Sequence, residues 1–189
     1  MRQVGVETVQ DIEGLKLRVG AEMVKVANAL GVVPVPLPAS EVYPAASRGI
    51  VEGMFFTSEN IPAFGIEDFV KEIRSLPGGF YNAAFFLVMN KAAWNRISAK
   101  DQAAIEAVSG EVFARNSGRA WDARVKAAEQ MMAERDVVVT PLPEVFVEEV
   151  RKRTATFVDA WVEQAKARNV DGAAALAYLR EEISRLEAG

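Results

Sequence analysis

The sequence contains neither cysteine nor histidine among its 189 residues. The absence of cysteine excludes disulfides and thiolate chemistry, and the absence of histidine removes the commonest general base and metal ligand. Ser-His catalytic triads and typical zinc sites are therefore impossible. No stretch approaches the roughly 18 consecutive apolar residues that a membrane span needs. Catalysis would have to rest on carboxylates, lysines or tyrosines, so the composition favours a protein that is not an enzyme and that uses neither a metal nor a cofactor.

The residues that are present have an ordinary globular composition. Half of them are hydrophobic, a quarter are charged, and the net charge is −4. The basic residues are scattered rather than clustered, which argues against a nucleic-acid partner. The length suffices for one good-sized core or two small lobes.

The first third of the chain alternates between strand-like and helix-like segments. This alternation predicts an α/β protein with a parallel sheet, in which the first three strands are neighbours. The predicted strands are 15–19, 32–37 and 50–56, and the predicted helices are 21–30, 41–47 (capped by Ser40) and 66–74, with a loop over 57–65.

Pro77-Gly78-Gly79 is the clearest break in the chain, and a long apolar run follows it. Residues 81–89 have the composition of a strand that is buried on both faces of a parallel sheet. The remaining predictions are a mostly helical stretch over 98–135 with possible kinks at Gly110 and Gly118, a strand over 137–140, and helices over 144–167 and 171–186.

Arg18 is the one cation placed at the end of the first apolar run. A guanidinium there can grip a carboxylate through two parallel hydrogen bonds. The alternative is an ordinary surface cation on an edge strand, and in either case we expect the fold to be largely indifferent to its replacement. Phe55 and Phe56 are adjacent, so a strand would point them to opposite faces, one toward the core and one toward a cleft.

Several motifs, in order and over nearly the whole chain, resemble the substrate-binding proteins of TRAP transporters, the DctP-type family. The motifs are Gly-Leu-Lys-Leu-Arg-Val (14–19), Leu-Gly before Pro-Val-Pro-Leu-Pro (30–38), Ser-Glu-Val-Tyr (40–43), Arg-Gly-Ile-Val-Glu-Gly (48–53), Val-Met-Asn-Lys-Ala-Ala-Trp (88–94) and Gly-Arg-Ala-Trp-Asp (118–122).

The resemblance implies a periplasmic-binding-protein-like fold, represented mainly by its second lobe: a mostly parallel sheet flanked by helices, plus long C-terminal helices. The chain resembles the C-terminal part of such a protein. Residues 1–77 would then form the β-α-β-α-β core of the second lobe. Residues 78–135 would form a crossover strand and a long helix that normally contact the first lobe, and residues 136–189 a strand and helices that pack on the second lobe.

The resemblance also implies a function and a set of site residues. The protein would be a periplasmic receptor that captures a small organic acid, a mono- or dicarboxylate, and hands it to membrane permease subunits. Arg18 would grip the carboxylate, and Met54, Phe56 and Thr57 would form a second ligand-contact stretch. Phe56 stands where some members carry asparagine, which implies a less polar solute, and Arg2 matches another arginine of some members.

Three further expectations remain open. The absent first lobe would leave an apolar patch around 80–87, so we expect self-association into a homo-oligomer through that face. A further alternative is a fragment that binds no solute and is stable only as a dimer. The alternative from a different class is an α/β enzyme that acts on a small carboxylic acid through Glu41 or Glu52 as the acid or base.

Overall fold

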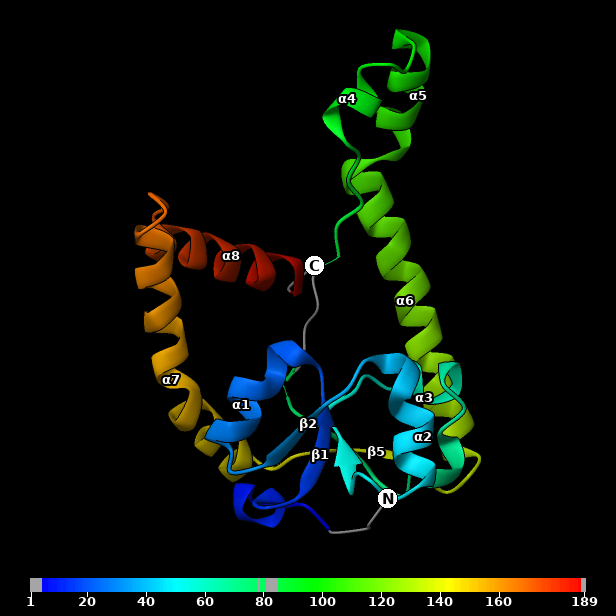
Figure 1. The fold of residues 1–189 in the computed structure, drawn as a ribbon, viewed down its shortest axis with the longest axis vertical. Coiled ribbons are helices and arrows are strands. Elements are labelled where there is room, and N and C mark those ends of the chain that lie inside the picture. Colours follow the sequence, from blue (N-terminus) through cyan, green and yellow to red (C-terminus); the bar gives the residue numbers. More distant parts are fainter. Residues whose placement is uncertain (1–4, 78, 81–84, 188–189) are drawn as a thin grey trace.

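The protein has an α/β fold with two small parallel sheets (Figure 1). The computed structural model describes residues 5–77, 79–80 and 85–187. The strands are β1 (Lys16–Val19), β2 (Val33–Pro36), β3 (Gly53–Met54), β4 (Ile73–Ser75) and β5 (Val139–Pro141). The α-helices are α1 (Val24–Ala29), α2 (Val42–Ser47), α3 (Asn60–Ala63), α4 (Lys91–Trp94), α5 (Ala99–Val108), α6 (Gly110–Ala133), α7 (Glu144–Lys166) and α8 (Gly172–Glu187), and the 3₁₀ helices are η1 (Val9–Ile12), η2 (Ala21–Met23), η3 (Ala39–Glu41) and η4 (Glu67–Phe69).

The first sheet has the strand order β2-β1-β3, and all of its strands are parallel. The prediction that 15–19, 32–37 and 50–56 are neighbouring strands of one sheet is confirmed. Gly31 joins α1 to β2 with φ +76°, a left-handed conformation that glycine adopts without steric cost. In the register, Arg18 of the central strand lies opposite Val35 on one side and Met54 on the other.

Helices cover both faces of this sheet, and each face has its own hydrophobic cluster. Alternation along β1 sends Leu17 and Val19 to the cluster formed with η1, α1 and the start of α7, where Leu30 and Phe146 are buried. The second cluster contains Val42 of α2, together with buried residues of α3 and of the C-terminal end of α6. Each fully buried aliphatic side chain stabilises the fold by about 1.5–3 kcal/mol relative to its exposed state.

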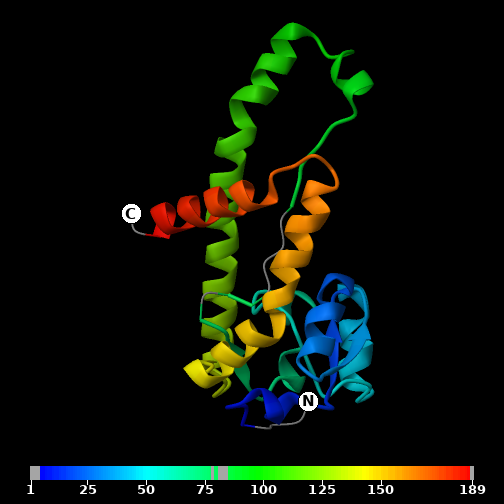
Figure 2. The same cartoon turned by 90° about the vertical axis from the view of Figure 1, so that its left-hand side faces the viewer.

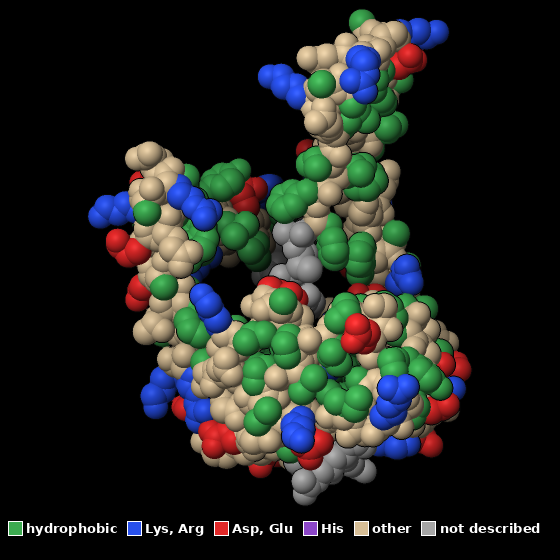
Figure 3. Space-filling view, in the orientation of Figure 1, with side chains coloured by type: hydrophobic (Ala, Val, Ile, Leu, Met, Phe, Trp, Pro, Cys, Tyr) green, Lys and Arg blue, Asp and Glu red, His purple; other side chains and the backbone are tan. Residues whose placement is uncertain are grey.

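Two helical arms leave this body in the same direction (Figures 1 and 2). One is α6, which carries α4 and α5 at its far end, and the other is α7 followed by α8. The extended segment 85–89 leads into the first arm, and each of its side chains is more than half exposed. Figure 3 shows hydrophobic side chains on the surface of the arms as well as on the body from which they rise.

The prediction of a helix over 66–74 is wrong. The segment forms η4 and then β4, which pairs in parallel with β5 to make the second sheet. Its apolar residues do have helical spacing, but Ile66 and Val70 are buried in the second cluster from a 3₁₀ turn and the residue after it. Pairing with a strand that is distant in the sequence has overridden the local pattern.

Four other local predictions also need correction. The stretch 98–135 forms two helices, because Ser109 is extended and Gly110 has φ +58°, whereas α6 runs uninterrupted through Gly118. Ser40 lies inside η3 and makes no capping hydrogen bond to α2. The predicted loop over 57–65 contains α3. Of the predicted strand 81–89, residues 81–84 lie outside the described residues, and 85–89 pair with no strand in the described part of the chain.

Candidate functional site

Arg18 is a buried residue of the central strand, with a relative exposure of 6 %. Its Nε and Nη2 donate to the carbonyl oxygen of Leu37 at 2.9 and 2.7 Å, and its Nη1 donates to the carbonyl oxygen of Phe55 at 3.5 Å. These contacts tie the ends of β2 and β3 to β1. The interpretation of Arg18 as a surface cation on an edge strand is therefore wrong.

The ring of Phe56 lies against this guanidinium, with Cζ of Arg18 4.6 Å from the ring centroid. Phe56 also packs on Phe64, at a centroid distance of 5.8 Å. Phe55 points to the other face of the sheet, where its ring meets Phe80 edge-on at 4.8 Å. The prediction that the two adjacent rings point to opposite faces is confirmed, and Phe56 is the ring that shares a face with Arg18.

The site lies at the carboxyl edge of a parallel sheet. Leu37 follows β2, and the stretch 55–57 follows β3, so the groups around Arg18 all come from segments just beyond the strand ends. Ligands of open α/β sheets bind in the crevice outside the carboxyl ends of the strands. Of the predicted site residues, the structure brings together Arg18, Met54 and Phe56, with Thr57 next in the chain. Arg2 lies outside the described residues.

The Thr57 hydroxyl contacts a buried carboxylate, that of Glu59, which was not among the predicted site residues. Glu59 has a relative exposure of 6 %, and its Oε1 accepts hydrogen bonds from Thr57 Oγ1 at 2.6 Å and from Trp121 Nε1 at 3.0 Å. The Trp121 ring in turn stacks on Phe85 with centroids 5.2 Å apart. No local sequence motif predicts this hydrogen-bond network, because Glu59 and Trp121 are 62 positions apart.

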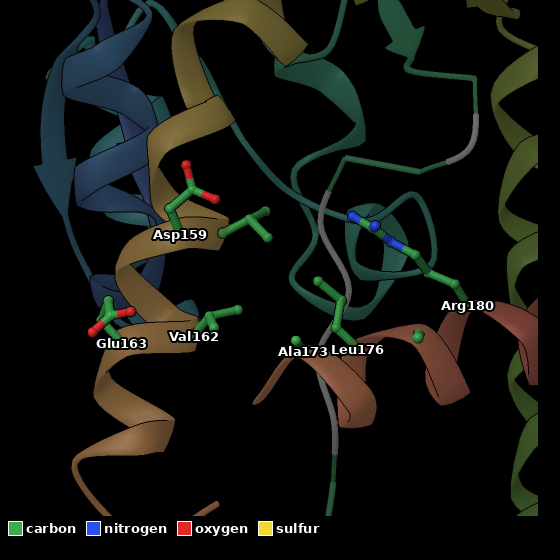
Figure 4. Close-up of a pocket in the computed structure, with 8 residues that line it drawn as sticks. Asp159, Val162, Glu163, Ala173, Leu176 and Arg180 are labelled. Carbon is green, nitrogen blue, oxygen red and sulfur yellow. The ribbon is translucent and has the colours of Figure 1, made fainter. Parts of the chain in front are cut away.

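One cavity adjoins these residues, and a second lies apart from them. One, of about 220 Å³, lies between the two sheets, and Met54, Phe56 and Thr57 are among its mostly apolar lining residues. The other is a larger, open hollow of about 540 Å³ between α7 and α8 (Figure 4). It holds none of the predicted site residues; its labelled lining residues are Asp159, Val162, Glu163, Ala173, Leu176 and Arg180. Arg18 is not among the described residues that line either cavity.

The resolved pKa shifts lie away from this edge, and all except that of Asp11 belong to ion pairs. A hydrogen bond from Arg153 is the largest cause that lowers the pKa of Glu149, and Arg153 also donates to Glu13 at 2.8 Å. The pKa of Arg74 is raised, mainly by its hydrogen bond to Glu72. The Arg153–Glu13 pair fastens α7 to the N-terminal segment, and a hydrogen bond from Arg74 to Glu7 at 3.2 Å does the same for β4, so the role of these contacts is structural.

The two carboxylates considered for acid–base catalysis do not meet. Glu41 follows β2 and is exposed, whereas Glu52 precedes β3 and accepts a hydrogen bond from the backbone amide of Lys16, at the first residue of β1. They therefore belong to opposite edges of the sheet. Among the described residues, no group of three or more acidic side chains is placed to hold a metal ion, and no helix is long and apolar enough to cross a membrane.

Comparison with known proteins gives a consistent result. Residues 3–165 match the DctP family, described as bacterial extracellular solute-binding protein, family 7. The outer membrane transporter protein TsaT of Comamonas testosteroni is 26 % identical over 158 residues, which cover 83 % of this chain and 46 % of TsaT.

Two solved structures share the fold. A TRAP periplasmic solute-binding protein from Bordetella bronchiseptica, with bound (R)- and (S)-mandelate, is 34 % identical with a TM-score of 0.85, over 97 % of this chain and 58 % of that one. A TRAP solute-binding protein from Rhodoferax ferrireducens, in complex with copurified benzoate, is 27 % identical with a TM-score of 0.83, over 95 % and 57 %.

The match therefore extends over most of this chain but over only about half the length of its relatives. The family is one of solute receptors of transporters, and its members are periplasmic. With its parallel sheet and flanking helices, the chain belongs to the DctP family of TRAP-type extracellular solute-binding proteins.

Proposed function

We propose that this chain binds a small aromatic monocarboxylate at the carboxyl edge of its first sheet, as part of a receptor that works in the periplasm. The observation that carries the proposal is the buried guanidinium of Arg18 with the Phe56 ring against it. A ligand's carboxylate would receive two parallel hydrogen bonds from the guanidinium. Its apolar body would lie near Phe56.

The contacts of Arg18 fit this role. Its two short hydrogen bonds to Leu37 hold the guanidinium plane in place, so a ligand meets a preorganised group. The 3.5 Å contact to the Phe55 carbonyl is long, and an incoming carboxylate would replace it with a stronger, charge-assisted bond. Met54 and Thr57 flank this position and would shape the rest of the site.

The relatives support the class of ligand. Mandelate and benzoate, held by the two solved relatives, each combine one carboxylate with one aromatic ring. Phe56 favours such a body over a strongly polar one. Arg18 would hold one carboxylate of a dicarboxylate in the same way, so discrimination between the two classes has to come from the rest of the site. We further propose that the receptor hands its acid to the membrane permease subunits of a TRAP transporter.

Calorimetric titration with benzoate and (R)-mandelate tests the proposal. Arg18→Ala should weaken binding about thirtyfold or more, because a truncated charged contact in a closed site costs about 2–5 kcal/mol. Arg18→Lys should weaken it nearly as much, since an ammonium cannot supply a planar two-pronged contact. Arg115→Ala is the matched control, because Arg115 is an exposed arginine on α6.

Far-UV circular dichroism of each variant establishes that the compared proteins are folded. If the Arg18 variants do not fold, Phe56→Leu replaces the ring by an aliphatic group and should weaken benzoate binding about threefold to tenfold. Equal affinities of the wild type and the Arg18 variants would remove Arg18 from the site. Failure of the wild-type chain to bind either acid at millimolar concentration would overturn the proposed function for this chain.

A further inference from the structure

The two carboxylate oxygens of Glu59 differ in their hydrogen bonding. Its Oε1 accepts hydrogen bonds from Thr57 Oγ1, Trp121 Nε1 and Asn60 Nδ2, at 2.6, 3.0 and 3.4 Å. Its Oε2 is buried and has no hydrogen-bond partner among the described residues. Buried acceptors in native proteins almost always have a partner, and an unmet one is costly. This oxygen therefore leaves Glu59 with unused acceptor capacity within the described part of the chain.

Thr57 places this acidic group next to the proposed site. The Thr57 hydroxyl donates to Glu59 and accepts from Asn60 Nδ2 at 2.7 Å. A hydroxyl has one proton, so toward a ligand Thr57 can only accept. The residue before it is Phe56, whose ring lies 4.6 Å from the Arg18 guanidinium carbon.

A second carboxylate lies near the same segment. Ser58 Oγ donates to Glu129 Oε1 at 3.4 Å, so both acidic side chains close to residues 57–60 take donors from that segment. Phe56 and Thr57 line the same cavity, so beside the Phe56 ring the site presents a hydroxyl that can only accept, held by the negatively charged Glu59. A ligand that carried a carboxylate at both ends would meet repulsion at the second end.

We infer that Glu59, acting through Thr57, selects acids whose far end carries a hydrogen-bond donor, such as a hydroxyl group, and rejects dicarboxylates. This inference rests on the proposed function, because it assumes that the acid's carboxylate binds Arg18. It assigns Glu59 a role in specificity beyond fastening α6 to residues 57–60.

Three acids that differ at a single ring position test the inference. Benzoate, 3-hydroxybenzoate and benzene-1,3-dicarboxylate carry hydrogen, hydroxyl and carboxylate there. In calorimetric titrations of the wild type, we expect 3-hydroxybenzoate to bind about tenfold more tightly than benzoate, because a hydrogen bond to a charged group is worth that much or more. The dicarboxylate should bind more weakly than benzoate.

Glu59→Gln keeps the size of the side chain and removes its charge. We expect the preference for 3-hydroxybenzoate over benzoate to fall to within about twofold, and the dicarboxylate to gain relative to benzoate. Glu67→Gln is the matched control: Glu67, in η4, also has a buried carboxylate oxygen without a partner among the described residues, but it lies outside residues 54–60. Its affinity ratios should equal those of the wild type.

Affinity ratios separate this role from a structural one, since a general loosening of residues 57–60 weakens all three acids alike. An unchanged ratio in Glu59→Gln, or an equal loss of all three acids, would overturn the inference while benzoate binding leaves the proposed function standing. If Glu59→Gln does not fold, Thr57→Val removes the accepting hydroxyl at constant shape and should also flatten the ratio. A wild-type chain that binds none of the three acids would overturn the proposed function itself.

Discussion

Replacement of Arg18 should destabilise the fold as well as weaken ligand binding. The guanidinium is buried in the central strand, donates twice to Leu37 and lies on the ring of Phe56. The predicted position of Arg18 at a strand end led us to expect that the fold would be indifferent to its replacement. The observed contacts reverse that expectation, because they join the segments that follow β2 and β3.

The expected magnitude follows from these contacts. A hydrogen bond from a charged donor contributes about 1.5–3 kcal/mol, and the two bonds share one acceptor, so they count as little more than one. The contact with the Phe56 ring adds about 0.5–1 kcal/mol. We therefore expect Arg18→Ala to lower the free energy of unfolding by about 2–4 kcal/mol. Arg18→Lys keeps the charge and much of the stem, and should cost about half of that.

Urea unfolding followed by circular dichroism measures this loss. With a slope of about 2 kcal/mol per molar urea, the midpoint for Arg18→Ala should fall by roughly 1–2 M. Lys16→Ala is the control, because Lys16 lies in the same strand with its side chain exposed, and it should change stability by no more than about 0.5 kcal/mol. An unchanged midpoint for Arg18→Ala would refute the idea that the guanidinium holds the sheet edge together.

Two further predictions concern the N-terminal segment and the exposed apolar strip. Hydrogen bonds from the backbone amides of Glu7 and Thr8, and from the Thr8 hydroxyl, lower the pKa of Asp11 from its ordinary 3.8. The stabilisation is therefore complete above pH 3.8 and is lost as the pH falls through the lowered pKa, so thermal unfolding of Asp11→Asn should depend less on pH in that window than unfolding of the wild type. Phe86 is 82 % exposed within an apolar segment, so we expect wild-type self-association in sedimentation velocity at high concentration, and Phe86→Asp should reduce it; a wild type that stays monomeric at every concentration would contradict this.

The first sheet could be predicted from the sequence because its signals are local. Each of its strands is a short apolar run separated from the next by a helix, and parallel pairing follows from that alternation. The helix predicted over 66–74 failed for the opposite reason. Ile73 pairs with Val139, and no local pattern carries information about a partner so distant in the sequence.

The residues of the candidate site likewise divide into those that could be predicted from the sequence and those that could not. Arg18 and Phe56 could be singled out because each lies in or beside an apolar run that matches a motif. Glu59 could not, because two features of the folded chain distinguish it: a hydrogen bond to Trp121, and an oxygen that has no partner among the residues that the structure describes. Trp121 stacks on Phe85, and its indole N–H adds the polar contact to Glu59.

The parallel pairing of β4 with β5 makes residues 76–138 one closed connection. The entropy of closing such a connection grows slowly, by only about 0.6 kcal/mol for each doubling of its length. The reach of the arm built from α4, α5 and α6 therefore adds little to the thermodynamic cost of the second sheet. Its effect falls on the order of folding, since β1 and β2 can pair across a short helix long before β4 finds β5. A longer or shorter arm should therefore have little effect on stability but should change the rate of folding.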